Sequence, residues 1–387
     1  MSIQLHHTAM PPLRLFLFSL LSARISSQQP SRHSANPRPR RGRVLSAQNV
    51  TYRPAALRTS FSKQLPLPTA PGQGARIAYL DGFSAGNVHI PGCSLFVHEP
   101  SNDKYISAGI VSNGRWTQPD DELFRRQAII FMARVLRSQP GSWFIDIGAN
   151  IGTFSLPLLV SGYRGILFEG LPRNAGLLRG SIAINGIDSQ HGGVLHAPCV
   201  LVSSTNATSP PYACMASSSR STANNQGGAF VSVRATRALA NAMSTGLNAS
   251  NQTVADAMCK QAHATSVAVR TATLADILPP PRNSKVPGRK DGQLHIGVIK
   301  MDIEGSEFEV LQGARSFLKA YLPAHILIEE RMDNRKRLRS PQSPVMLLQE
   351  EFGYVVVEAN INGGDNYHLA QPGTPPINVV DPTWNVQ

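Results

Sequence analysis

Apolar and polar positions follow two different periods through most of the chain. Short continuous apolar runs, typical of buried strands, alternate with segments in which apolar residues recur at helical spacing. The strand-like runs are 143–147, 165–168, 194–202, 296–301 and 326–328, and the helix-like segments are 150–160, 175–184 and 306–318. This alternation predicts an α/β fold with a mostly parallel, doubly wound sheet covered by helices on both faces. The run 353–358 and the turn at Gly363 and Gly364 predict a closing antiparallel hairpin.

The pattern is different before this alternation. Short β-type runs at 88–97 and 105–110 are broken by Pro and Gly, and they predict a small strand-rich cap over 78–120. An apolar stretch at 123–136 has acidic residues before it and a basic residue after it. It predicts the first helix of a main domain over 121–387.

One segment of the main domain, residues 204–265, interrupts the alternation. It is dominated by Ser, Ala, Asn and Thr, and its one acidic residue is Asp256. We expect a surface insertion that is largely flexible. Cys214 and Cys259 both lie in it. They would close a loop in a secreted protein, and two free thiols fit the sequence equally well.

Charge and composition narrow the function. The chain has 387 residues and a formal net charge of +13, but residues 1–80 hold ten Arg, one Lys and no acidic residue. The other 26 basic and 24 acidic residues leave a net charge of only +2. We therefore interpret 1–77 as a disordered basic tail and expect no nucleic acid among the partners. No run reaches the roughly 18 apolar residues of a membrane span, and no Cys-x-x-Cys pair offers a common zinc spacing.

The tail begins with a candidate targeting segment. The apolar run 15–23 is flanked by arginines, as in a secretory signal peptide or a short membrane signal anchor. Abundant Arg and Ser without acidic residues are also typical of a plastid or mitochondrial transit peptide, and a disordered extension with a chance apolar patch is the third alternative. Sequons at Asn49, Asn206, Asn248 and Asn251 favour the secretory pathway and a glycoprotein.

The sharpest local motif is 144–154, FIDIGANIGTF. A strand ends near Asp146, and small residues then turn the chain into a helix and let a ligand approach the backbone. The dinucleotide fingerprint Gly-x-Gly-x-x-Gly is absent, and a nearby carboxylate disfavours a pyrophosphate. The same carboxylate suits S-adenosylmethionine, which has no phosphate and carries an ammonium and a sulfonium. An ordinary turn in which Asp146 caps a helix is the alternative.

Two further charged features follow strands. Glu169 closes the next strand 23 residues after Asp146, where an acid can hold the ribose hydroxyls of a nucleotide. Lys300, Asp302 and Glu304 alternate along an extended run, so we expect their side chains on one side at the carboxyl end of a strand. An ion pair that orders the strand end is the simpler interpretation. Burying three charges without partners is costly, however, and this favours a site.

The segments FIDIGANIGTFSL and IKMDIEGSEFEVLQGA together resemble the FkbM family of S-adenosylmethionine-dependent methyltransferases. The resemblance spans roughly 106–370, and its most specific part is the Lys-x-Asp-x-Glu-Gly segment. Supporting positions at the family's spacing are Glu169, Asn185 and Gly186, 273–276, and Ile328 and Glu329. The chain departs from the family at three places. Gly170 replaces the usual proline, Ala275 replaces the first Asp of a Leu-Asp-Asp pattern, and the insertion is unusually long.

The resemblance implies a Rossmann-like class I methyltransferase with S-adenosyl-L-methionine as cofactor. The implied reaction is an in-line displacement that O-methylates a hydroxyl of a sugar or secondary metabolite. The implied cofactor contacts are Asp146, Gly148, Ala149, Asn150, Gly152 and Glu169. Asp302 is the first candidate for the base or acceptor-positioning group and Glu304 the second, and Lys300 would tune their pKa values or hold the acceptor. We assign no metal ligands, although Asp302 and Glu304 could hold Mg²⁺ together with an acceptor oxygen.

Two other function classes stay open on sequence alone. A nicotinamide-dependent oxidoreductase uses a similar sheet, but Asp146 and the missing third glycine disfavour it. A non-catalytic binding module would keep the fold, although the intact Lys-x-Asp-x-Glu-Gly segment favours activity. The partner we expect is a small-molecule or glycan acceptor, and the sequence carries no signal for the oligomeric state.

Overall fold

A computed structural model describes residues 74–187, 193–204, 211–217, 229–244, 251–263, 265–279, 294–330, 343–361 and 364–380. The predicted tail, 1–77, and its targeting segment lie outside these residues except for 74–77. Among the helices that the structure describes, none is long and apolar enough to cross a membrane.

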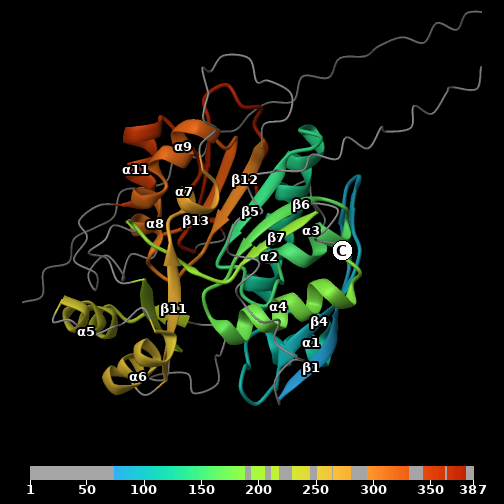
Figure 1. The fold of residues 1–387 in the computed structure, drawn as a ribbon. Coiled ribbons are helices and arrows are strands. Elements are labelled where there is room, and N and C mark those ends of the chain that lie inside the picture. The colour runs from blue at the N-terminus through green and yellow to red at the C-terminus, as the bar shows by residue number, and fades with distance from the viewer. Residues whose placement is uncertain are drawn as a thin grey trace, which may run out of the picture. The chain divides into compact units, whose positions relative to one another are not determined.

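The fold is built on a seven-stranded sheet with the order β14-β15-β13-β12-β5-β6-β7 (Figure 1). These strands are β5 (Trp143–Ile147), β6 (Arg164–Phe168), β7 (Val194–Ala197), β12 (Ile296–Met301), β13 (His325–Glu329), β14 (Val355–Glu358) and β15 (Asn366–Ala370). The five central strands pair in parallel, and β15 pairs antiparallel with both β13 and β14. The predicted sheet and its closing hairpin are therefore confirmed, while Gly363 lies outside the described residues.

Helices cover both faces of this sheet. They are α2 (Pro119–Ser138), α3 (Ser155–Val160), α4 (Pro172–Ile184), α7 (Leu274–Ile277), α8 (Glu307–Gly313), α9 (Arg315–Tyr321) and α11 (Pro344–Phe352). Successive side chains of a strand point to opposite faces, so Phe144 and Leu167 pack with α2, α3 and α4. Their neighbours Ile145 and Phe168 pack with α7, α8, α9 and α11. Because both faces are buried, the central strands are apolar almost throughout, which is why the sequence pattern located them.

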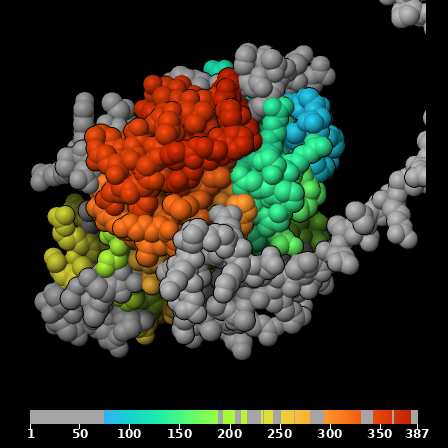
Figure 2. Space-filling view, turned by 90° about the horizontal axis from the view of Figure 1, so that it is seen from above, coloured from blue at the N-terminus to red at the C-terminus, as the bar shows by residue number. Residues whose placement is uncertain are grey.

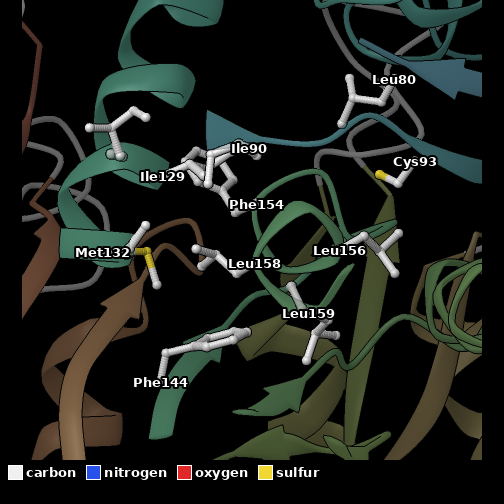
Figure 3. Close-up of a cluster of buried hydrophobic side chains, with 14 of the residues drawn as sticks. Leu80, Ile90, Cys93, Ile129, Met132, Phe144, Phe154, Leu156, Leu158 and Leu159 are labelled. Carbon is white, nitrogen blue, oxygen red and sulfur yellow. The ribbon is translucent and has the colours of Figure 1, made fainter. Parts of the chain in front are cut away.

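The first of these two cores is shown in Figure 3. Ile129 of α2 lies beside Ile90 of β3 and Phe154, and Met132 of α2 lies on the side that carries Phe144, near Leu158 of α3. In the space-filling view of Figure 2, the orange and red C-terminal residues lie against the teal residues of the N-terminal half. The pairing of β12 with β5 joins these two halves of the chain.

In the N-terminal segment, a short hairpin lies between the two strands of a longer antiparallel pair, and a helix follows. The strands are β1 (Ala75–Leu80), β2 (Phe83–Ala85), β3 (Val88–Ile90) and β4 (Cys93–His98), with β1 paired to β4 and β2 to β3. Asn185, at the end of α4, fastens β4 to the main domain. Its side-chain amide donates to the carbonyl oxygen of Ser94 at 2.6 Å, and its amide oxygen accepts from the N–H of Ser94 at 3.1 Å.

The strand expected at 105–110 is wrong, because these residues lead into the helix α1 (Ser107–Asn113). The carboxylate of Asp103 accepts hydrogen bonds from the backbone N–H groups of Ile106 and Ser107, at 3.3 and 3.0 Å. It also accepts from the Ser107 hydroxyl at 2.6 Å. An acidic group that satisfies N–H groups at a helix start favours the helix over a strand.

The described part of 204–265 carries regular structure that the sequence analysis did not predict. Its elements and their neighbours are β8 (Val200–Leu201), β9 (Tyr212–Ser217), β10 (Ala229–Val231), α5 (Val233–Ser244), α6 (Gln252–Ala262) and β11 (Ser266–Ala272). We call the four strands the inserted sheet, and their order in it is β10-β9-β11-β8. Figure 1 shows α5 and α6 next to β11, away from the helices of the main sheet. The many Ala, Ser and Thr residues here give little hydrophobic contrast, so neither period could be recognised.

Cys214 of β9 and Cys259 of α6 form a disulfide across 45 residues of sequence. The sequence had left this pair open. The bond lies in a small core with Tyr212, Leu239 and Ala268, between the helices and one face of the inserted sheet. Two buried free cysteines, Cys93 and Cys199, complete the cysteines of the chain.

Replacing Cys214 and Cys259 together by Ser should lower the free energy of unfolding by about 2–4 kcal/mol, because the unfolded chain gains the freedom of an unclosed loop. Urea denaturation followed by circular dichroism measures this loss. A reducing agent should weaken the wild-type protein to the same extent and leave the double variant unchanged. Equal sensitivity of the two proteins to reduction would contradict the assignment of the bond.

Candidate active site

A cavity of about 340 Å³ lies at the carboxyl ends of the central strands. Its position follows from the strand order, because the chain runs outward from β5 in one direction and from β12 in the other. In open α/β sheets the crevice at such a reversal is where ligands bind. Residues that directly follow β5, β6 and β12 line the cavity, among them Gly148, Glu169 and Asp302.

The turn after β5 brings its backbone against that of β12. Gly148 has a φ of 85°, and a Cβ at this position would collide with the carbonyl oxygen of Asp302. Gly152 has a φ of 97°, and a Cβ there would stand 2.6 Å from a methyl carbon of Leu178. Both glycines are thus required by the packing of the protein itself. Asn150 also has a positive φ, 52°, which asparagine tolerates better than most residues.

Glu169 is buried at the carboxyl end of β6 and faces this turn. One of its carboxylate oxygens accepts from the N–H of Asn150, and the other from the N–H of Leu171, both at 2.8 Å. Burial raises the pKa of Glu169 to about 7, although the two N–H groups oppose the shift. The two hydrogen bonds fix the plane of the carboxylate and leave further lone pairs available to a ligand.

Lys300 is the central charge of the site. Its side chain is 5% exposed, and its ammonium lies 3.4 Å from Oδ1 of Asp146 and 3.5 Å from Oδ2 of Asp302. The carbonyl oxygen of Gly148 is 3.4 Å away, and the ring centroid of Phe154 is 4.7 Å away. Burial on its own lowers the pKa of Lys300, but the two carboxylates outweigh it and hold the pKa above its ordinary value. The lysine therefore stays charged and joins the ends of β5 and β12.

The loop after β12 does not continue the extended alternation that we expected. Asp302 does lie on the same side as Lys300, but Glu304 has a φ of 58° and Gly305 a φ of 95°, so the chain turns there. The buried side chain of Glu307 holds this turn by accepting from the N–H groups of Ile303, at 2.9 Å, and Gly305, at 3.3 Å. Burial raises the pKa of Glu307 to about 7. Its role was not recognised in the sequence, where it reads as an acidic residue in the first turn of a helix.

Aromatic residues from the N-terminal segment close the cavity over the lysine. Trp116 and Phe124 both pack edge-on against Phe154, with ring centroids 5.8 and 6.3 Å apart, and all three line the cavity. Tyr105 and Asp121 line it as well. The sequence analysis missed these four residues of the N-terminal half, since no spacing relates them to the motifs.

Most of the predicted site residues lie together. Gly148, Ala149, Asn150, Glu169, Lys300, Asp302 and Glu304 all line the cavity. The other two, Asp146 and Gly152, are not among its lining residues. Asp146 is 1% exposed, pairs with Lys300 and accepts from the hydroxyl of Ser155. The structure thus places Asp146 behind Lys300, whereas Asp302, with 40% of its side chain exposed, faces the cavity.

Among the residues that the structure describes, no group of three His, Cys, Asp or Glu side chains is placed to hold a metal ion. Mg²⁺ usually keeps several water ligands and needs few protein ligands, so Mg²⁺ held by Asp302 and Glu304 stays the alternative to the site without metal ligands that the sequence analysis assigns.

A family model, the methyltransferase FkbM domain, matches residues 146–356, which is more than half of the chain. The chain belongs to the FkbM methyltransferase family. This membership, with the strand order of the sheet, makes the fold a class I methyltransferase fold. The match begins at Asp146 and includes Glu169 and the Lys-x-Asp-x-Glu-Gly segment.

Solved methyltransferase structures are similar to this FkbM chain at low identity. Methyltransferase FkbM from Methylobacillus flagellatus KT is 14% identical, with 59% of this chain and 43% of that chain covered and a TM-score of 0.32. A putative O-methyltransferase from Klebsiella pneumoniae is 12% identical, with 66% and 90% covered and a TM-score of 0.31. An O-methyltransferase from Bacillus cereus in complex with SAH is 12% identical, with 66% and 81% covered and a TM-score of 0.30. The chain spans less than half of the first of these proteins, and a search of curated proteins found no match.

The raised pKa of Glu169 predicts a pH dependence of stability. Between pH 4.5, the ordinary pKa of the carboxyl, and about 7, the folded protein retains a proton that the unfolded chain has lost. The contribution of the protonated Glu169 to the free energy of unfolding is therefore complete below pH 4.5 and is lost as the pH rises to about 7. Glu169→Gln should flatten the fall in unfolding free energy over this range, as measured by denaturant titrations at a series of pH values. Glu307→Gln should flatten it similarly, and an unchanged slope in Glu169→Gln would contradict the assigned pKa.

Proposed function

We propose that this FkbM methyltransferase uses S-adenosyl-L-methionine to O-methylate a hydroxyl group of a small molecule or glycan. The observation that carries the proposal is one cavity that is lined by both Glu169 and the Asp302–Lys300 pair. Glu169 suits a ribose, and Asp302 is a carboxylate that an acceptor can reach.

The residues present fit such a cofactor. Each oxygen of Glu169 already accepts one backbone hydrogen bond and has a lone pair left for a ribose hydroxyl. The backbone of Gly148, Ala149 and Asn150 forms the adjacent wall. A dinucleotide fits less well, because Lys300 is the one basic residue among the described lining residues and is already paired with two carboxylates. A pyrophosphate would meet acidic groups here instead of free cations.

S-adenosylmethionine supplies an electrophilic methyl group when it is bound. The protein must then orient an acceptor hydroxyl and take its proton, and Asp302 is the group placed to do both. The ammonium of Lys300, anchored by Asp146 and the carbonyl oxygen of Gly148, holds the carboxylate of Asp302 from behind. Glu304, on the same loop and also at the cavity, is the second candidate for this role.

The walls around Asp302 indicate the kind of acceptor. Asp121, Asp302, Glu304 and Glu329 give the cavity a negative character, so an acceptor with a phosphate or carboxylate group is disfavoured. Trp116 and Tyr105 supply flat apolar surfaces beside these acids. A neutral polyhydroxylated molecule such as a sugar, or a hydroxylated secondary metabolite, meets both conditions.

The disulfide supports a location in the secretory pathway, in the ER or Golgi lumen or outside the cell. Disulfides persist in oxidising compartments and are rare in the cytosol. Asn251, the one sequon asparagine among the described residues, is exposed at the start of α6, where its side-chain oxygen accepts from the N–H of Thr253. An N-terminal signal peptide or signal anchor would deliver the chain there, and a plastid or mitochondrion is the alternative.

Asp302→Asn should lower methyl transfer by about 10²- to 10⁴-fold and leave binding of S-adenosylhomocysteine within about threefold of wild type, because it removes the proton acceptor and not the cofactor's contacts. Transfer is measured with methyl-labelled S-adenosylmethionine against extracts, followed by mass analysis of the labelled product. Binding is measured by calorimetry.

Glu169→Gln provides the converse control and should weaken binding first. Normal transfer by Asp302→Asn would remove Asp302 from the mechanism and direct attention to Glu304→Gln. No binding of the homocysteine product by the wild-type protein would overturn the proposed cofactor.

The full-length protein expressed in a eukaryotic secretory host should run faster on a gel after glycosidase treatment, because its sequons would be modified in the lumen. Asn251→Gln should remove part of this shift and leave the rest, which checks that the change arises from N-linked glycans. Import into isolated plastids or mitochondria with removal of the tail, and no glycosidase shift, would decide for the transit-peptide alternative.

A further inference from the structure

Gly170, which follows Glu169, packs against a side chain from a distant part of the chain. A Cβ at position 170 would stand 2.5 Å from Sδ of Met215 and 2.9 Å from a methyl carbon of Val200. The φ of Gly170 is not in the left-handed region, so the backbone alone does not require glycine. Met215 fills the space beside the glycine, so a side chain at position 170 would displace Met215. Position 170 is also where this chain has glycine in place of the family's usual proline.

Met215 belongs to β9, so the inserted sheet reaches the cavity. Side chains alternate along β9, and Cys214 points into the core below α5 and α6 while Met215 points the other way. The disulfide to Cys259 and the antiparallel pairing with β11 hold the strand in this register. Val231 of β10 reaches the cavity from the same sheet. The insertion therefore supplies part of the cavity wall.

The cavity has two chemically different sides. The lining residues at the end of β12 and after it include Lys300, Asp302 and Glu304, whereas the residues between β6 and β11 that line the cavity are uncharged: Gly170, Cys199, Val200, Leu201, Met215 and Val231. β6 lies between β5 and β7 in the sheet, so Glu169 stands between the two sides. A nucleoside whose ribose is held by Glu169 would point its base to one side or the other. A neutral, flat base is best accommodated on the uncharged side.

We propose that Met215 forms the wall against which the adenine ring of S-adenosylmethionine packs, so that the insertion is part of the cofactor site. This inference rests on the proposed function, because it takes Glu169 as the ribose-binding residue. Methionine suits the role, since its flexible thioether adapts to a flat ring and makes favourable contacts between sulfur and aromatic groups. The face of the inserted sheet that carries the disulfide then serves to hold this wall in place.

Calorimetry with S-adenosylhomocysteine on the full chain tests the inference through a matched pair of variants. Met215→Ala should weaken binding about tenfold, because the ring loses apolar contact. Met258→Ala makes the same substitution on α6, on the other face of the inserted sheet, and should leave the affinity within twofold of wild type. 5′-Methylthioadenosine, which keeps the adenine and lacks the amino-acid part, should lose affinity for Met215→Ala by the same factor.

Gly170→Ala gives a second test, of the contact between position 170 and Met215. It should weaken binding in the wild-type background, where the new methyl group displaces Met215. It should cost less in the Met215→Ala background, where that space is empty. Additive effects of the two substitutions would contradict the contact.

The outcomes separate the two proposals. If the wild-type protein and Met215→Ala bind S-adenosylhomocysteine equally well, the role of Met215 is overturned and the proposed function stands. Equal losses in Met215→Ala and Met258→Ala would also overturn it, because the effect would then come from the stability of the inserted sheet. Wild-type protein that binds neither nucleoside would overturn the proposed function itself.

Discussion

The buried ammonium of Lys300 is the constraint on which the rest of the site depends. A buried charge is costly unless it is paired, and here two carboxylates from different strands pair with it, Asp146 at the end of β5 and Asp302 after β12. These strands are the two between which the sheet reverses direction. The pairing draws their loops so close that position 148 has no room for a side chain.

This ion pair changes the roles that the motif suggests. Asp146 looks like a ligand for a cationic cofactor in the sequence, but its carboxylate is occupied by Lys300 and Ser155 behind the cavity wall. It is a positioning residue: it anchors the lysine, and the lysine in turn presents Asp302 to the cavity. Glu169 remains the candidate for binding the ribose hydroxyls, because its two hydrogen bonds come from backbone N–H groups and leave lone pairs on the carboxylate.

The inserted sheet obeys the same alternation rule as the main sheet. One face of β9 carries Cys214 and its bond to α6, and the other presents Met215 to the cavity. An insertion that the sequence suggested was peripheral is therefore joined to the site through Met215 of β9 and Val231 of β10. The N-terminal segment contributes in a similar way through Trp116 and Tyr105, so two segments outside the central alternation complete the cavity.

The sequence by itself determined the central strands, the closing hairpin and most of the charged residues of the site. Buried parallel strands are continuously apolar, and their carboxyl ends carry the polar groups, so both are readable from local pattern. Tertiary structure alone decided that 105–110 leads into a helix and forms no strand, that 194–202 divides between two sheets, and that Asp146 lies behind Lys300 while Met215 lies beside Gly170. Each of these depends on side chains that meet across a turn or across many residues of chain, and no local period records such a meeting.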